Sequence, residues 1–232
     1  MIANCRGVIY LRIFGLLMVG LCGCDRKLSS WYPFAAPVNE DHGITTPVQR
    51  KKNLEELVKK APTTTDPGQR ESICQELAQE IRKEPDSLMR SEILRTMAVY
   101  GGVTTDAVMH VAVRDTDADV RVVVCDLWGK RKDAEAVRVL AGVLASDSDR
   151  DVRMAAARAL GHSHDPSAAR ALGPALDDPD PAMRFRAMVA LRESTGKNIG
   201  TDPSDAERWR QYVKTGEVPP LPWAQRLFPW YH

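Results

Sequence analysis

Apolar residues recur at helical spacing through the middle of the chain, and a second helical pattern follows each first one. Spacings of three and four residues place these side chains on one face of a helix. No alternating pattern typical of a β-strand accompanies them. We therefore expect an all-α fold built from helix pairs, with short turns at 129–133 and 161–165. The apolar positions are Val120, Val123, Val124 and Leu127, then Val137, Leu140, Ala141 and Leu144, then Val152, Ala155, Ala156, Ala159 and Leu160, then Ala168, Leu172, Ala175 and Leu176.

An aspartate followed four residues later by an arginine marks the start of successive helices. The last three intervals between copies are 31, 32 and 31 residues, whereas the first copy, at Asp66 and Arg70, comes only 20 residues before the second. Aspartate is a good N-cap, because its carboxylate accepts hydrogen bonds from free backbone N–H groups. The arginine, one turn later, either pairs along its own helix or reaches the next repeat's acid and forms a ladder. The predicted ladder consists of Asp86, Arg90, Asp117, Arg121, Asp149, Arg153, Asp180 and Arg184.

The segment RDVRMAAARALGHSHDPSAARALGPALDDPDPAMRFRAMVALR resembles HEAT repeats of the short bacterial type, also described as phycobilisome-lyase-like repeats. Residues 151–191 match the pattern well and residues 86–147 more loosely. The resemblance implies a short right-handed α-solenoid. A single short helix pair buries too little apolar surface to be stable alone, so the pairs must stack. We expect N-terminal capping helices over 48–85, HEAT-like repeats over 86–194 and a C-terminal capping helix over 195–216.

The N-terminal residues predict export and membrane attachment. An apolar run of signal-peptide length ends in LCGC, Leu21 to Cys24, which resembles the lipobox of bacterial lipoproteins. The resemblance implies that residues 1–23 are a signal peptide, that Cys24 is lipidated, and that the protein is anchored to a cell membrane facing the periplasm or exterior. An uncleaved anchor helix is the alternative, although Arg12 interrupts the apolar run. Residues 24–47, rich in Pro, Ser and Thr, read as a flexible tether.

Charge and cysteine content narrow the classes of partner. Removal of residues 1–23 takes away Arg6 and Arg12 and leaves 30 basic against 31 acidic residues. Nucleic acid is therefore not an expected partner, since that binding relies on a basic surplus. Cys74 and Cys125 lie in apolar helical patterns, where a buried free thiol is the commoner state, and a disulfide between them is the alternative.

The only cluster of metal-ligand residue types is GHSHDP, with His162, His164 and Asp165. The preceding copy has GKRKDA at the same place, so we interpret the cluster as a turn whose Asp165 caps the next helix. Some HEAT-repeat enzymes bind two irons through adjacent His-Glu pairs, and the sequence has no such pair. We expect no catalytic residue, metal, cofactor or small-molecule substrate. The alternative is a metal-dependent or lyase-type enzyme built on HEAT repeats.

These patterns predict a membrane-anchored, non-catalytic module that binds an unidentified protein partner or acts as a scaffold in the cell envelope. Stacked pairs expose one row of second helices as a groove, where we place Glu135, Arg138 and Arg170 as candidate binding residues. Residues 217–232 form a tail rich in proline and aromatic residues. The tail packs along the solenoid, docks elsewhere or rests at the membrane interface. Its candidate docking residues are Trp223, Phe228, Trp230 and Tyr231.

Overall fold

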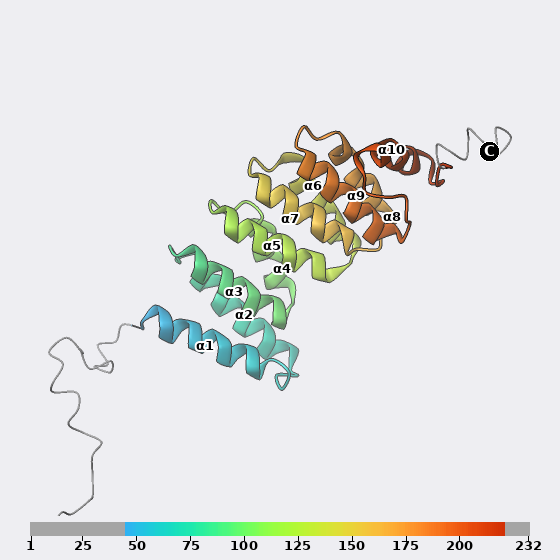
Figure 1. The fold of residues 1–232 in the computed structure, drawn as a ribbon. Coiled ribbons are helices and arrows are strands. Elements are labelled where there is room, and N and C mark those ends of the chain that lie inside the picture. The colour runs from blue at the N-terminus through green and yellow to red at the C-terminus, as the bar shows by residue number, and fades with distance from the viewer. Residues whose placement is uncertain (1–44, 221–232) are drawn as a thin grey trace, which may run out of the picture. The chain divides into compact units, whose positions relative to one another are not determined.

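The computed structural model describes residues 45–220, and these residues form an α-solenoid of stacked helix pairs (Figure 1). The described residues contain no β-strand, so the predicted all-α fold is confirmed. The predicted signal peptide, Cys24 and the four aromatic residues of the tail lie outside the described residues. The α-helices are α1 (Pro47–Lys60), α2 (Pro67–Ile81), α3 (Ser87–Tyr100), α4 (Val103–Ala112), α5 (Ala118–Arg131), α6 (Ala134–Ser146), α7 (Arg150–Gly161), α8 (Pro166–Leu172), α9 (Pro181–Thr195) and α10 (Ala206–Thr215), with short 3-10 helices η2 (Gly173–Asp177) and η3 (Pro203–Asp205).

The helices are arranged in two rows. The first row consists of α1, α3, α5, α7 and α9, each of which packs on the next. The second row consists of α2, α4, α6 and α8, and α10 closes it against η2 and α9. The first pair stacks on the second, because α1 packs on α3 and α2 packs on both α3 and α4.

Side-chain caps explain where the helices begin. The carboxylate of Asp86 accepts a hydrogen bond from the N–H of Leu88 at 3.0 Å, and Asp117, Asp149 and Asp180 cap α5, α7 and α9 in the same way. Such a bond satisfies backbone donors that have no partner within the helix.

The first copy of the Asp-Arg pattern is out of step because it marks a second-row helix. Asp66 caps α2, whereas α1 is capped by Thr46, whose hydroxyl accepts a hydrogen bond from the N–H of Gln49 at 3.2 Å. Arg50 lies four residues after Thr46, so threonine takes the place of aspartate in the first pair. The first copy in the first row is therefore Thr46 with Arg50, which a pattern that requires aspartate does not include.

Small residues let the first-row helices approach closely. A β-carbon added to Gly129 of α5 would lie 2.8 Å from the β-carbon of Ala159 of α7, and the methyl-bearing face of α7 is fully buried. Two buried clusters make up the core, one within α1 to α3 and one from α3 to α10, and both contact Ile81 and Val108. The core is therefore continuous along the stack, as stacking of short helix pairs requires.

One turn between paired helices is shorter than the sequence predicted, and a buried indole lies at the C-terminal end of the described stack. Helix α5 continues through Arg131, so the predicted turn at 129–133 is reduced to Lys132 and Asp133. At the C-terminal end the indole of Trp209 is fully buried and donates a hydrogen bond to the carbonyl oxygen of Gly200 at 2.7 Å. Within residues 45–220, no helix combines the length and apolar character that crossing a membrane requires.

Candidate protein-binding groove

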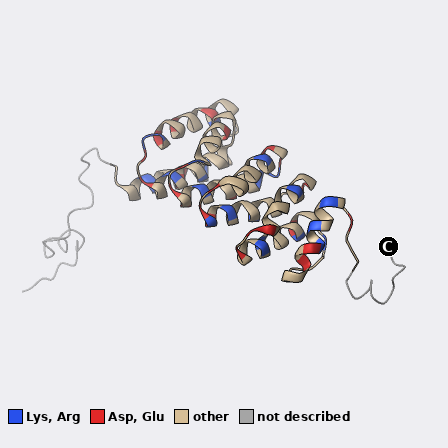
Figure 2. Ribbon diagram, turned by 90° about the horizontal axis from the view of Figure 1, so that it is seen from above, with Lys and Arg blue, Asp and Glu red and all other residues tan. Residues whose placement is uncertain are grey.

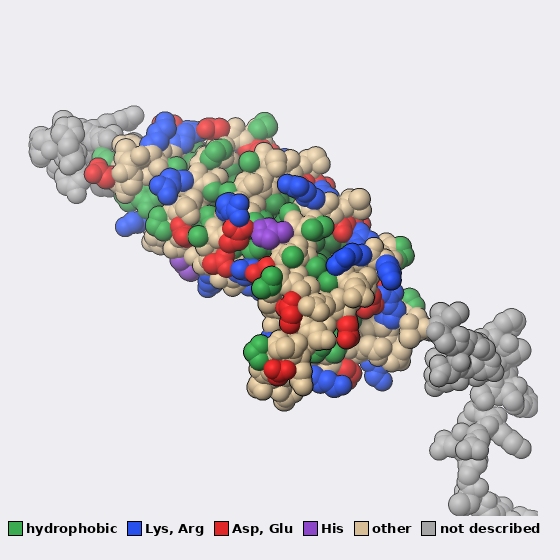
Figure 3. Space-filling model, turned by 180° about the vertical axis from the view of Figure 1, so that it is seen from behind, with side chains coloured by type: hydrophobic (Ala, Val, Ile, Leu, Met, Phe, Trp, Pro, Cys, Tyr) green, Lys and Arg blue, Asp and Glu red, His purple; other side chains and the backbone are tan. Residues whose placement is uncertain are grey.

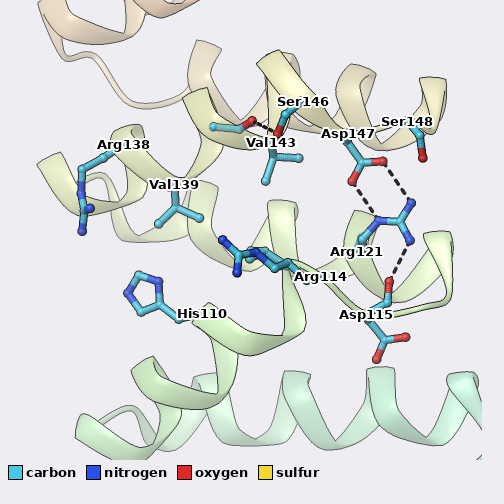
Figure 4. Close-up of a pocket in the computed structure, with 12 residues that line it drawn as sticks. His110, Arg114, Asp115, Arg121, Arg138, Val139, Val143, Ser146, Asp147 and Ser148 are labelled. Carbon is cyan, nitrogen blue, oxygen red and sulfur yellow. Dashed lines mark hydrogen bonds and ion pairs between the residues drawn. The ribbon is translucent and has the colours of Figure 1, made fainter.

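An open groove separates α4 from α6 in the second row (Figure 4). Helix α2 packs directly on α4, and α6 packs directly on α8, but α4 and α6 are held apart. The gap has a volume of about 580 Å³. It is lined by His110, Val113, Arg114, Asp115, Arg121, Arg138, Val139, Gly142, Val143, Ser146, Asp147 and Ser148. We call it the α4–α6 groove.

The two sides of the α4–α6 groove combine apolar and basic side chains. Val139 and Val143 project from α6, and Arg114 extends from the end of α4 toward them (Figure 4). His110 faces Arg138 across the opening, and its Nε2 lies 3.1 Å from Oε1 of Glu135. Seen from behind, the solenoid surface likewise mixes hydrophobic and charged side chains (Figure 3). The groove thus offers both apolar contact and positive charge to a ligand.

The imidazole of His110 packs against side chains of α5. The imidazole packs against the buried indole of Trp128 at a tilt of 56°, with ring centroids 4.8 Å apart, and the guanidinium of Arg131 lies 4.7 Å from the centre of the same indole. Arg131 also donates a hydrogen bond to Asp133 at 2.9 Å and pairs with Asp106. The imidazole therefore rests on a platform whose own side chains are fixed.

Arg138 and Glu135 form an exposed pair at the rim. Nε of Arg138 donates a hydrogen bond to Glu135 at 2.9 Å. This hydrogen bond is the main reason that the pKa of Glu135 is lowered, and the charges of Arg138 and His110 lower it further. Glu135 is consequently a carboxylate at neutral pH and orients the two basic groups around it.

The floor of the groove consists of ion pairs that join successive repeats. Arg121 of α5 donates hydrogen bonds to both carboxylate oxygens of Asp147, at 2.8 and 3.0 Å, and to the carbonyl oxygen of Asp115 at 2.8 Å. Arg90 binds Asp115 in the same two-pronged way, at 2.9 and 2.7 Å. Burial tends to raise the pKa of Asp147, but hydrogen bonds from Arg121 and from the N–H of Asp149 outweigh it, and the pKa is lowered. The pKa of Asp115 is lowered for the same reasons, with Arg90 and Asp117 as donors.

The ion pairs of Arg90 and Arg121 therefore run between repeats and end on acids that are not N-caps, whereas Arg150 of α7 pairs with Asp180, the N-cap of α9. Arg90 and Arg121 reach the acid two residues before the next N-cap, and that acid also accepts a hydrogen bond from the cap's own N–H. Arg153 and Arg184 instead donate to carbonyl oxygens of their own preceding turns. The sequence signal that we missed is the acid at the second position before each cap: Glu84, Asp115, Asp147 and Asp178.

The structure brings together some of the predicted binding residues and separates others. Arg138 lines the α4–α6 groove and Glu135 contacts both His110 and Arg138 beside it, whereas Arg170 is exposed on α8 and does not line the groove. His110 and Arg114, which line the groove, carried no sequence signal beyond being polar positions in a helical pattern. Asp165 caps α8 and accepts a hydrogen bond from the N–H of Ser167 at 2.7 Å. Cys74 and Cys125 are buried and not bonded to each other.

Among residues 45–220, no three His, Cys, Asp or Glu side chains are grouped so that they could hold a metal ion. His162 and His164 are exposed, and they contribute to a different groove described below.

Paired helices stacked in two rows with inter-repeat ion pairs define a helical-repeat solenoid. The chain matches HEAT repeats over residues 54–161, 105–192 and 143–208, and it belongs to the HEAT-repeat proteins. No curated protein matches it. Among solved structures, human deoxyhypusine hydroxylase in complex with glycerol is similar, with 25% sequence identity and a TM-score of 0.48. That match covers 53% of this chain and 44% of the hydroxylase chain, so the chain spans less than half the length of that structure.

Proposed function

We propose that this HEAT-repeat protein is a membrane-anchored, non-catalytic module that binds a protein partner or acts as a scaffold in the cell envelope. The observation that carries the proposal is the α4–α6 groove, which is open and combines valines with three arginines and a histidine. Small-molecule sites bury most of their ligand in concave pockets. An open groove with mixed lining suits a segment of another protein, whose apolar and acidic side chains can alternate along it.

The rigid floor of the groove supports this role. The ion pairs of Arg90 and Arg121 tie three successive repeats together, so the distance between α4 and α6 is set before a partner arrives. A preformed site loses less conformational entropy on binding than one that must be ordered. The partner's side of the interface would then determine the selectivity.

Membrane attachment is the second part of the proposal and depends on residues 21–24. Processing at LCGC would leave Cys24 as a lipidated N-terminus, with residues 25–46 as a tether before α1. Acyl chains add about 0.8 kcal/mol of membrane affinity for each buried methylene, so several chains give a lasting anchor. A tether of this length lets the solenoid sample partners near the membrane surface.

Affinity capture of the full chain from detergent-solubilised membranes tests the binding role. Proteins that co-purify with the wild type should be lost with Arg138→Glu, which reverses a charge at the groove. They should be retained with Arg170→Glu, which makes the same change on the same row away from the groove. Equal recovery with both variants would contradict the assignment of the groove.

Metabolic labelling with a radioactive fatty acid tests the anchor. The wild type should incorporate label and sediment with membranes, and Cys24→Ser should do neither. Label in the Cys24→Ser variant would show that this cysteine is not the attachment site.

A further inference from the structure

A second groove lies on the other row of the solenoid, over α3, α5 and α7, which stack side by side (Figure 1). It has a volume of about 480 Å³ and an apolar floor that includes Val123, Leu127 and Ala159. Its remaining lining contains the basic or imidazole side chains Arg95, Lys130, Lys132, His162 and His164, and one acid, Asp126. We call it the basic groove.

The positive charges of Lys130 and Lys132 in the basic groove are not neutralised within the described residues, whereas Arg95 has an acidic partner. Asp126 already accepts a hydrogen bond from Arg158 at 2.8 Å, and Glu92 pairs with Arg95 at 3.2 Å. Glu193 of α9 packs behind Gly161 and does not line the groove. Between residues 45 and 220, neither Lys130 nor Lys132 forms an ion pair. Basic and acidic residues are interspersed along the rest of the stack (Figure 2), so this local excess is distinctive.

Two of these side chains are placed by an unfavourable backbone conformation. Lys132 has φ 56° and His164 has φ 53°, and in residues 45–220 they are the only residues other than glycine with positive φ. The equivalent turns after α3 and α9 use Gly101 and Gly196, with φ 71° and 69°. A left-handed conformation costs a residue with a β-carbon about 1 kcal/mol or more, and such strain persists only where the surrounding structure enforces it. The two central repeats thus carry a basic or imidazole side chain where glycine would fit better.

The backbone around the basic groove offers no cradle for a compact anion such as phosphate. Lys130, Lys132, His162 and His164 lie at the C-terminal ends of α5 and α7. Helix C-termini present carbonyl oxygens and a partial negative charge, so they offer no N–H cradle for a phosphate. Long basic side chains can still reach carboxylates that lie over the apolar floor.

The spacing of the repeats sets the spacing of the ligand's charges. Packed helices lie about 8–10 Å apart. A chain in the polyproline II conformation advances about 3.1 Å per residue and makes one turn every three residues, so every third side chain points the same way, about 9 Å further along. A carboxylate at every third residue would therefore meet one repeat after another: first Arg95, then Lys130 and Lys132, then His162 and His164.

We propose that the basic groove binds an extended acidic segment of a partner protein, in which acidic residues recur at every third position. This inference rests on the proposed protein-binding function and names the chemistry of a partner at a separate face. The strained turns at Lys132 and His164 serve to hold basic side chains over the apolar floor formed by Val123, Leu127 and Ala159.

Fluorescence anisotropy with the purified full chain in detergent tests the inference. The probe is a labelled peptide of about nine residues with glutamate at every third position among alanine and serine, compared with a peptide of the same composition whose glutamates are adjacent. We expect the periodic peptide to bind at least tenfold more tightly. Raising the salt concentration from about 50 to about 500 mM should weaken its binding, because screening shortens the reach of exposed charges.

Substitutions separate binding from folding. The double variant Lys130→Gln, Lys132→Gly should bind the periodic peptide at least tenfold more weakly. Its midpoint of thermal unfolding should not fall, because glycine accepts the left-handed conformation at residue 132. Lys51→Gln with Lys52→Gln removes the same charge from α1 and should leave binding unchanged. Arg138→Glu should also leave peptide binding unchanged. The proposal for the α4–α6 groove and the proposal for the basic groove can therefore fail independently, with different results.

Three results would overturn the inference. Equal affinity for the two peptides would show that the groove does not select acidic residues by their spacing. Unchanged binding in the Lys130→Gln and Lys132→Gly variant would place the site elsewhere. Displacement of the peptide by inorganic phosphate at equal concentration, or tighter binding to vesicles containing an anionic phospholipid, would show that the groove recognises phosphate groups and not carboxylate spacing.

Discussion

Replacement of Gly129 by alanine should force α5 and α7 apart at their closest approach. A β-carbon on Gly129 would lie 2.8 Å from the β-carbon and 3.2 Å from the α-carbon of Ala159, closer than carbon atoms pack. Ala159 is buried in the core, and its own helix cannot rotate the methyl away. The added atom must therefore displace backbone, and the displacement disturbs the ion pairs that span the same two repeats.

Two opposing effects set the change in the free energy of unfolding of Gly129→Ala. Overpacking a well-packed core by one methyl group costs about 1–3 kcal/mol. Alanine in a helix interior is favoured over glycine by about 1 kcal/mol, and Gly129 lies near the end of α5, where this gain is smaller. We therefore expect Gly129→Ala to lower the free energy of unfolding by about 1–2 kcal/mol.

Gly142→Ala provides the matched control. Gly142 lies within α6, and a β-carbon there would meet nothing within 4 Å. The same substitution should raise the free energy of unfolding by about 0.5–1 kcal/mol, because alanine favours the helix over glycine and no overpacking opposes the gain. Urea unfolding followed by circular dichroism at the helical band measures both variants.

A second substitution tests the contact itself. Ala159→Gly removes the methyl group that Gly129→Ala would strike, so the double variant should be more stable than the two single changes together predict. If Gly129→Ala were as stabilising as Gly142→Ala, or if the two changes were additive, the close approach of α5 and α7 would not be what limits residue 129.

Three further predictions concern the floor of the α4–α6 groove and the core. Asp147→Ala should lower the free energy of unfolding by about 2 kcal/mol, because it leaves a largely buried guanidinium of Arg121 without its carboxylate; Glu135→Gln, at the exposed pair, should change urea unfolding far less. The folded-state pKa of Asp147 lies below its unfolded value, so this carboxylate stabilises the fold above about pH 4 and the contribution is lost as the pH falls through the folded-state value. Unfolding measured between about pH 3 and pH 6 should therefore show a shallower pH dependence for Asp147→Asn than for the wild type, and equal slopes would contradict the role of this pair. Burial raises the pKa of the Cys125 thiol to about 12, so peptide mapping after treatment with iodoacetamide at about pH 8 should find Cys125 unmodified in the folded protein and modified in urea, and rapid modification without urea would refute its burial.

The local features of this protein could be predicted from its sequence. Apolar positions spaced by three and four residues indicate helices, and aspartate N-caps fix where α3, α5, α7 and α9 begin. Both signals act within a few residues, so no knowledge of distant contacts is needed. The repeat of about 31 residues then requires that the helix pairs stack, because one pair alone cannot bury its apolar face.

Features that depend on the distance between helices could not be predicted. The arginine ladder illustrates this, because Arg90 and Arg121 have an acid four residues away in sequence and another in the next repeat, and only the stacking geometry selects the second. The α4–α6 groove exists because α4 and α6 do not pack on each other as their neighbours do, a difference that periodicity does not encode. The same stacking places Lys132 beside His164 over one groove, although 31 residues lie between them. Sequence thus determined which helices form and that they stack, whereas tertiary packing decided which side chains meet.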